Sequence, residues 1–177
     1  KSHSDRSLYA QLYVRAPPKP NTDLVAEPGD FDISRRIFDF KSGNEIYQFN
    51  EAKVNDRFIV LLSGRKFGES GYYSRKILAM IKDPVPAGFQ IESIILPNNN
   101  KDSFEFLPKL SYVNVTEIND DAFFAANFIN NNRRMNVAYV IRATSPGSYL
   151  ATQAVMENMY APKSFGTSDG VAIRVTK

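Results

Sequence analysis

The stretch that most constrains the fold runs from Tyr139 to Tyr149, with the sequence YVIRATSPGSY. Before its turn, apolar side chains recur at every second position, which is the period of a half-buried strand. Pro146 and Gly147 then predict a turn, because proline fixes φ near a turn value and glycine tolerates a positive φ. A second extended run follows over Ser148–Val155. We therefore expect this stretch to be one hairpin of an all-β domain.

Other short apolar runs along the chain have the length and alternation of strands, and polar or glycine-containing turns separate them at intervals of roughly 8–12 residues. This pattern predicts an antiparallel β-sandwich, and the turn at Met159–Pro162 is expected to end a strand. The further expected strands are Leu8–Val14, Phe31–Phe40, Ile46–Phe49, Arg57–Ser63, Tyr72–Ile81, Phe89–Leu96, Phe104–Phe106, Tyr112–Ile118, Ala122–Ile129 and Val171–Val175.

A proline-rich segment, Arg15–Pro28, separates the first expected strand from the others. It contains four of the ten prolines of the chain, and no regular element persists through such a run. We expect residues 1–53 to be N-terminal strands and an extended, proline-rich segment that leads into the domain. The sandwich itself is expected to comprise residues 54–177.

The composition of the 177-residue chain excludes several functional classes. Its net charge is +3, and the basic residues occur in pairs rather than in a stripe, so nucleic-acid binding is not expected. No apolar run is long enough to cross a membrane, so we expect no membrane insertion of this chain. The chain has no cysteine, and its single histidine is His3, in a polar terminal stretch. No histidine-based or thiolate-based catalytic or metal site is therefore expected, and no cofactor.

The best candidate for a contact surface is the glycine-rich loop at residues 64–73. It combines Arg65 with Tyr72 and Tyr73, and these residue types are favoured at protein interfaces because they bury a large area at a modest cost in entropy. The residues thus indicate a binding, scaffolding or inhibitory module without a visible active site.

Four motifs in a fixed order carry a resemblance to a known family. They are Asp83–Phe89, Glu117–Asp121, Tyr139–Gly147 and Met159–Pro162. In this order the chain resembles the C-terminal domain of bacterial alpha-2-macroglobulins, most firmly from Val54 to Lys177. The resemblance gives a structural role to eight motif residues: Asp83, Pro84, Gly88, Asp121, Pro146, Gly147, Tyr160 and Pro162.

The resemblance implies a macroglobulin-like β-sandwich, similar to the receptor-binding domain of the animal proteins. It implies a non-catalytic, cofactor-free part of a broad-spectrum protease inhibitor that is periplasmic and lipid-anchored. In such inhibitors a protease cuts a bait region, and a thioester in another domain captures the protease. The implied partners are the thioester domain, other macroglobulin-like domains of the same parent chain and the trapped proteases. This domain is expected to pack against the thioester domain and to stabilise the uncleaved state.

The sequence departs from the family pattern after the turn at Gly147. The family often has two prolines where this chain has Thr152–Gln153, so we expect a less irregular strand here. Two alternatives remain open. One is a stand-alone adhesin or carbohydrate-binding sandwich with coplanar aromatic side chains on one face. The other is a hydrolase with two carboxylates in a cleft.

Overall fold

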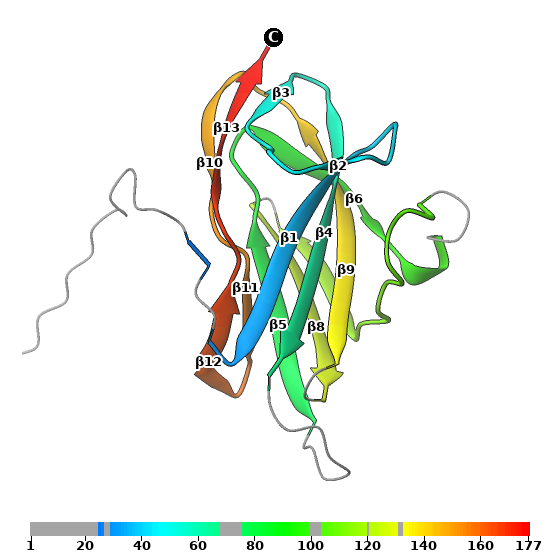
Figure 1. Ribbon diagram of the computed structural model, residues 1–177, viewed down its shortest axis with the longest axis vertical. Helices are drawn as coiled ribbons and strands as arrows, with labels where there is room; N and C mark the ends of the chain where they lie inside the picture. Colours follow the sequence, from blue (N-terminus) through cyan, green and yellow to red (C-terminus); the bar gives the residue numbers. More distant parts are fainter. Residues whose placement is uncertain (1–24, 27–28, 68–75, 100–103, 120, 131–132) are drawn as a thin grey trace, which may run out of the picture.

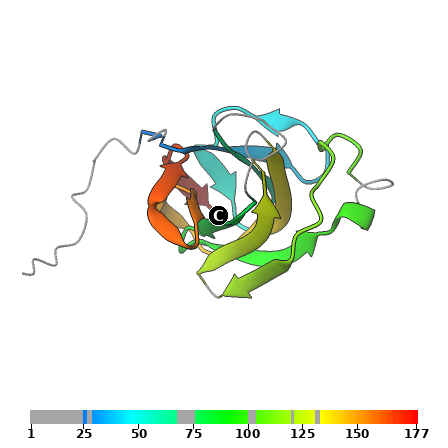
Figure 2. The same cartoon turned by 90° about the horizontal axis from the view of Figure 1, so that it is seen from below.

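In a computed structural model, the described residues are 25–26, 29–67, 76–99, 104–119, 121–130 and 133–177. They form an all-β sandwich, as the sequence predicts, with two five-stranded sheets as its layers (Figures 1 and 2). Three expected features lie outside the described residues: the strand Leu8–Val14, most of the proline-rich segment, and Tyr72 and Tyr73 of the predicted contact surface.

The first sheet is antiparallel and has the order β2-β1-β4-β9-β6. Its central strand β4 is buried on both faces, as its continuous apolar run predicts, and pairs with β1 and β9 along its whole length. These strands are β1 (Phe31–Asp39), β2 (Glu45–Ile46), β4 (Arg57–Lys66), β6 (Phe89–Ile95) and β9 (Arg134–Ala143). The expected boundary after residue 53 therefore falls within one sheet, since β1 precedes it and β4 follows it.

The second five-stranded sheet has the order β12-β11-β5-β8-β7, and a small sheet, β10-β13-β3, lies at one end of the sandwich (Figure 1). All pairs are antiparallel except that of β3 with β13. The strands of the second sheet are β5 (Ile77–Pro84), β7 (Val115–Asn119), β8 (Ala122–Ile129), β11 (Val155–Asn158) and β12 (Ala161–Thr167). Those of the small sheet are β3 (Glu51–Lys53), β10 (Gly147–Ala151) and β13 (Val171–Thr176).

The described residues form two hydrophobic cores, which hold these layers. The main core lies between the sheets and includes the inward side chains of β1, β4, β5, β8 and β9. A smaller core covers the outer face of the first sheet, where Leu107 and Leu110 pack on Ile59, Ala138 and their neighbours. Strand β9 is consequently buried on both faces rather than half-buried, because the segment at residues 104–110 covers its second face.

The stretch from Tyr139 to Tyr149 is a strand, a turn and a strand, but it is not a hairpin. Strand β9 pairs with β4 and β6, whereas β10 pairs with β13 in the small sheet. The extended run expected from Ser148 to Val155 is interrupted at residues 152–154, where the chain passes from the small sheet to the second sheet. The expected regularity at Thr152–Gln153 is therefore wrong.

Another short expectation is wrong as well. Phe104–Phe106 is not an extended piece but part of a turn, because its rings pack on one another and on the first sheet. The turn expected at Met159–Pro162 does end a strand, because β11 stops at Asn158, but it comprises only Met159 and Tyr160, and the chain continues as β12, which pairs with β11.

Candidate functional site

Three of the four sequence motifs meet at one end of the sandwich. The backbone oxygen of Gly88 accepts hydrogen bonds from the backbone nitrogen (2.8 Å) and the hydroxyl (3.1 Å) of Thr144. The backbone nitrogen of Val85 donates to the oxygen of Asp121 at 2.8 Å. The first motif, Asp83–Phe89, thus connects the turn before β8 with the turn after β9.

Glycine is required twice in this arrangement because of Tyr149. A Cβ atom at Gly88 would lie 2.1 Å from the ring of Tyr149, and Gly147 has a φ of +155° with the same tyrosine beside it. The Tyr149 hydroxyl donates to the backbone oxygen of Pro146 at 3.2 Å, which fixes the ring over the turn. These motif residues therefore shape the turns at this end of the sandwich.

A buried ionic cluster lies between the two sheets, next to this end. The Arg35 guanidinium on β1 donates to both carboxylate oxygens of Asp83 on β5, and the Tyr139 hydroxyl on β9 donates to Asp83 Oδ2 at 2.6 Å. Arg35 also donates to the backbone oxygen of Thr152, in the crossing segment between sheets. The Asp83 side chain is only 1% exposed. We call Arg35, Asp83 and Tyr139 the clasp.

The electrostatics of the clasp follow from its burial. Desolvation raises the pKa of Asp83, against the opposing effects of Arg35 and of the Tyr139 hydroxyl. Burial also raises the pKa of Tyr139 well above its usual value, and the neighbouring Asp83 charge adds to this effect. Asp83 is thus paired with an arginine and a tyrosine rather than with a second carboxylate, which does not match the arrangement that a glycoside hydrolase needs.

The space beside the clasp is too small for a substrate. The cavity measures about 30 Å³, and apolar side chains such as Ile37, Val60 and Ile173 complete its lining. Such a volume holds about one water molecule. In the described residues, no group of three or more acidic, histidine or cysteine side chains could hold a metal ion.

The family resemblance implies a structural role for Asp83, whereas Arg35 was not predicted. The signal was present, because Arg35 occupies the inward positions of β1 together with Phe31, Ile33 and Ile37, which are all buried. A charged residue at an inward strand position requires a partner. That partner lies 48 residues away and cannot be identified from the period of β1 alone.

The fourth motif lies at the opposite end and has a different character. Met159 and Tyr160 form the tight turn between β11 and β12, and Tyr160 is 81% exposed. The turn is fixed from both sides: the Tyr160 nitrogen donates to Asn158 Oδ1 at 3.1 Å, and the Met159 nitrogen donates to the Leu78 oxygen at 3.0 Å. We call Met159 and Tyr160 the tip. Pro162 follows on the edge strand β12, where a missing backbone N–H is tolerated.

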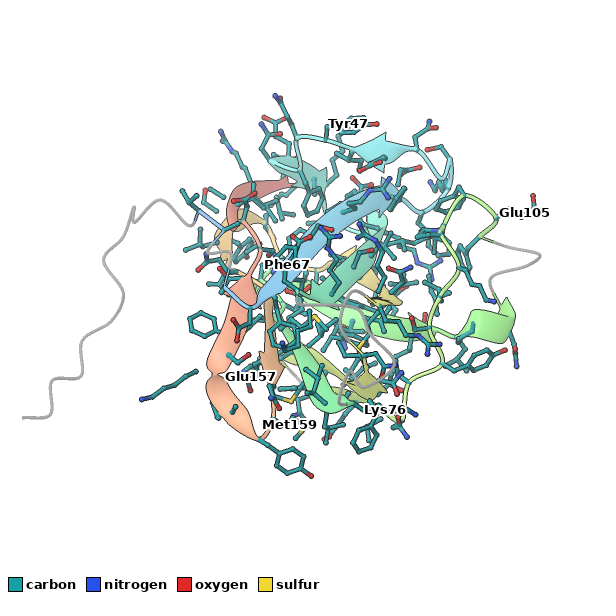
Figure 3. All side chains as sticks on the ribbon, turned by 60° about the horizontal axis from the view of Figure 1, so that its bottom comes forward. Tyr47, Phe67, Lys76, Glu105, Glu157 and Met159 are labelled. Carbon is teal, nitrogen blue, oxygen red and sulfur yellow. The ribbon has the colours of Figure 1, made fainter. Side chains whose placement is uncertain are left out.

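Arg65 is the one described residue of the three that were named for the predicted contact surface, and it is engaged within the domain. Its Nε donates to Asp32 Oδ2 at 3.2 Å, and its guanidinium lies 4.9 Å from the centre of the Phe67 ring. Figure 3 shows Met159 and Tyr47 at opposite ends of the molecule.

Comparison with known proteins identifies the family. The family model described as "Bacterial Alpha-2-macroglobulin MG10 domain" matches residues 31–163. The chain belongs to this family. The MG10 domain is 28% identical over 106 residues to alpha-2-macroglobulin of Xylella fastidiosa, and 28% identical over 94 residues to that of Escherichia coli. These matches cover 55% and 48% of this chain, and 6% of each relative.

Solved structures agree with the fold of the MG10 domain. A mutant Salmonella alpha-2-macroglobulin matches with a TM-score of 0.72 and 23% identity, over 89% of this chain and 10% of that one. Escherichia coli alpha-2-macroglobulin activated by porcine elastase matches with a TM-score of 0.70 and 21% identity, over 86% and 14% of the two chains. At these identities the matches establish the fold alone.

Proposed function

We propose that this MG10 domain is the non-catalytic C-terminal domain of a bacterial alpha-2-macroglobulin-type protease inhibitor. The parent protein would be periplasmic and lipid-anchored, and its partners would be proteases. The family match supports this proposal, as do relatives whose structures are described as activated by trypsin or by elastase. The chain spans only 6% of its curated relatives, so bait and thioester chemistry would belong to other domains.

Within that protein, the domain would stabilise the uncleaved state by placing the tip against the thioester domain. The single observation that carries this role is the exposure of Tyr160 at 81% on a turn fixed by hydrogen bonds. An exposed aromatic side chain on a rigid turn is a typical interface anchor, because little entropy is lost when it is buried. The tip would thereby exclude water from the thioester until the bait is cut.

The test compares Tyr160→Ala with Tyr47→Ala in the full-length parent protein. Tyr47 is 87% exposed at the opposite end, so the two changes remove the same group from equally open positions. We expect Tyr160→Ala to accelerate thioester hydrolysis before cleavage by about tenfold, which corresponds to about 1.4 kcal/mol, and Tyr47→Ala to leave the rate unchanged. The released thiol measures the rate.

A second measurement does not depend on the thioester. Deuterium exchange at residues 158–161 should be slow in the uncleaved parent and should increase after protease cleavage. An unchanged hydrolysis rate in Tyr160→Ala, together with equal exchange before and after cleavage, would refute the role of the tip. The paired variant Tyr72→Ala with Tyr73→Ala tests in the same assay whether the predicted contact surface takes part.

A further inference from the structure

We propose that the outer face of the second sheet is the binding surface for another domain of the same parent chain. We call it the bare face, and its apolar members are Leu78, Met80, Val115, Phe124, Phe128 and Phe165. This inference rests on the proposed function in one respect, namely that the chain is part of a longer inhibitor. It differs from that function because it concerns a sheet face rather than the tip.

Strand register places these side chains in adjacent rows. Val115 is opposite Ala126, which is opposite Met80, and the row continues through Glu157 to Phe165. In the next row, Phe128 is opposite Leu78, and the Leu78 oxygen accepts a hydrogen bond from Met159 of the tip. The bare face is therefore continuous with the tip at the end of this second row.

The bare face belongs to neither hydrophobic core. None of its six residues is part of either core cluster of the described residues, whereas their inward neighbours on β5 and β8, Ala79, Ile81, Phe123 and Ala125, are buried in the main core. An antiparallel sheet with one face in water normally presents polar side chains on that face. Apolar outward positions on several adjacent strands are instead typical of a surface covered by protein.

The two sheets differ in how their outer faces are covered. Over the first sheet, Leu107 and Leu110 complete a second core. Over the second sheet, Val115 and Phe128 remain more than half exposed among the described residues. Within the part of the chain that the structure describes, one outer face is thus covered by the domain's own residues and the other is not.

A neighbouring domain of the parent is the occupant that fits this surface. The curated relatives are far longer than this chain, which covers 6% of them, so most of such a parent lies outside the structure. A further row on this face runs from Glu117 through Phe124, Lys82 and Val155 to Thr167. Outward charges in this row and in the row from Val115 to Phe165 are limited to Lys82, Glu117 and Glu157, and Lys82 lies 5.5 Å from the centre of the Phe124 ring. This nearly neutral, apolar surface suits a permanent contact between domains rather than an encounter with a charged partner.

Hydroxyl-radical footprinting of the full-length, uncleaved parent protein tests the proposal. We expect the oxidation rates of Phe128 and Met80 to be at least fivefold below those of exposed Phe and Met residues in the same protein. Leu150 is the matched control, because its exposure is 50% against 51% for Phe128 and it lies on the small sheet. Oxidation of Phe128 at the rate of a half-exposed side chain, or equal protection of Leu150, would overturn the proposal.

A pair of variants identifies the occupant. Phe128→Glu in the full-length parent should increase deuterium exchange severalfold in one contiguous region outside residues 1–177, whereas Leu150→Glu should not. New exchange within residues 1–24 would assign the face to this chain's own N-terminal segment and overturn the inference. Protection of Phe128 that disappears on dilution would assign the bare face to a second copy of the protein and would also overturn the inference.

The same footprinting experiment also measures the oxidation of Tyr160 in the tip, so the two proposals can fail separately. Protection of Tyr160 without protection of Phe128 would refute the bare face as an interface and leave the proposed function standing. Protection of Phe128 with free oxidation of Tyr160 would refute the proposed role of the tip and leave the bare face standing as an interface.

Discussion

At the scale of single residues, Asp39 shows how a short side chain determines a turn. Its Oδ1 accepts hydrogen bonds from the nitrogen and the hydroxyl of Ser42, both at 2.7 Å, and from the nitrogen of Lys41 at 3.2 Å. These bonds, led by that of the Ser42 hydroxyl, lower the pKa of Asp39, because they stabilise its charged form. Asp83 shifts in the opposite direction, since burial between the sheets disfavours its charge.

The lowered pKa of Asp39 predicts a dependence of stability on pH. Its contribution is complete above the unfolded pKa and is lost as the pH falls through the folded pKa. We expect Asp39→Asn to lose less stability than the unmodified chain between about pH 5 and pH 2, measured by urea unfolding at each pH. Glu105→Gln, which alters an exposed carboxylate outside this turn, is the control. Identical profiles for Asp39→Asn and the unmodified chain would contradict the prediction.

At the scale of elements, the sequence predicts the bounds of a strand well where the strand's pattern is local. The strands at Phe31–Phe40, Arg57–Ser63 and Ala122–Ile129 were predicted nearly within their observed bounds, because alternation or a continuous apolar run is sufficient for each. Partner choice was less predictable. Strand β10 directly follows the turn after β9, as in a hairpin, yet it pairs with β13.

The candidate site could be predicted only in part, for the same reason. The sequence indicated Tyr160 as a motif residue, but its exposure depends on the continuation of the chain as β12 after the turn. Arg35 and Asp83 come together only when the two sheets are stacked. No period within β1 or β5 specifies that pairing.

The segment at residues 104–110 shows that an element without regular structure can complete a core. Leu110 is buried against the outer face of the first sheet. We expect Leu110→Ala to reduce the free energy of unfolding by about 2–5 kcal/mol, because it leaves a cavity in the smaller core. Leu150→Ala, at a half-exposed position, should change it by no more than about 0.5 kcal/mol. Urea denaturation of both variants measures the difference, and equal values would show that the segment does not stabilise the sheet.

At the scale of the whole molecule, the sandwich has two different ends. One end contains three motifs, Tyr149 and the small sheet, and its hydrogen bonds determine how the chain passes between sheets. The other end presents the tip, where an aromatic side chain is exposed on a short turn. The clasp lies between the layers and connects β1 and β9 of the first sheet with β5 of the second.

The clasp provides a test of what holds the layers together. Asp83→Asn leaves the Arg35 guanidinium buried without an opposite charge, so we expect a loss of about 3–5 kcal/mol in the free energy of unfolding. Asp32→Asn is the matched control on β1: its pair with Arg65 is open to solvent, and its loss should stay below about 1 kcal/mol. Urea denaturation compares the two.

A combined variant distinguishes the effect of an unpaired buried charge in the clasp from the effect of packing on the free energy of unfolding. Arg35→Met, Asp83→Leu and Tyr139→Phe together remove the arginine, the carboxylate and the hydroxyl, so no buried polar group of the clasp remains unpaired. Because an apolar replacement of similar volume removes the desolvation penalty, we expect it to recover most of the stability lost in Asp83→Asn. A combined variant as unstable as Asp83→Asn would contradict this account, because the loss would then come from packing. Recovery would instead mean that the layers are held by apolar contact, and that the clasp acts by requiring Arg35 of β1 to face Asp83 of β5.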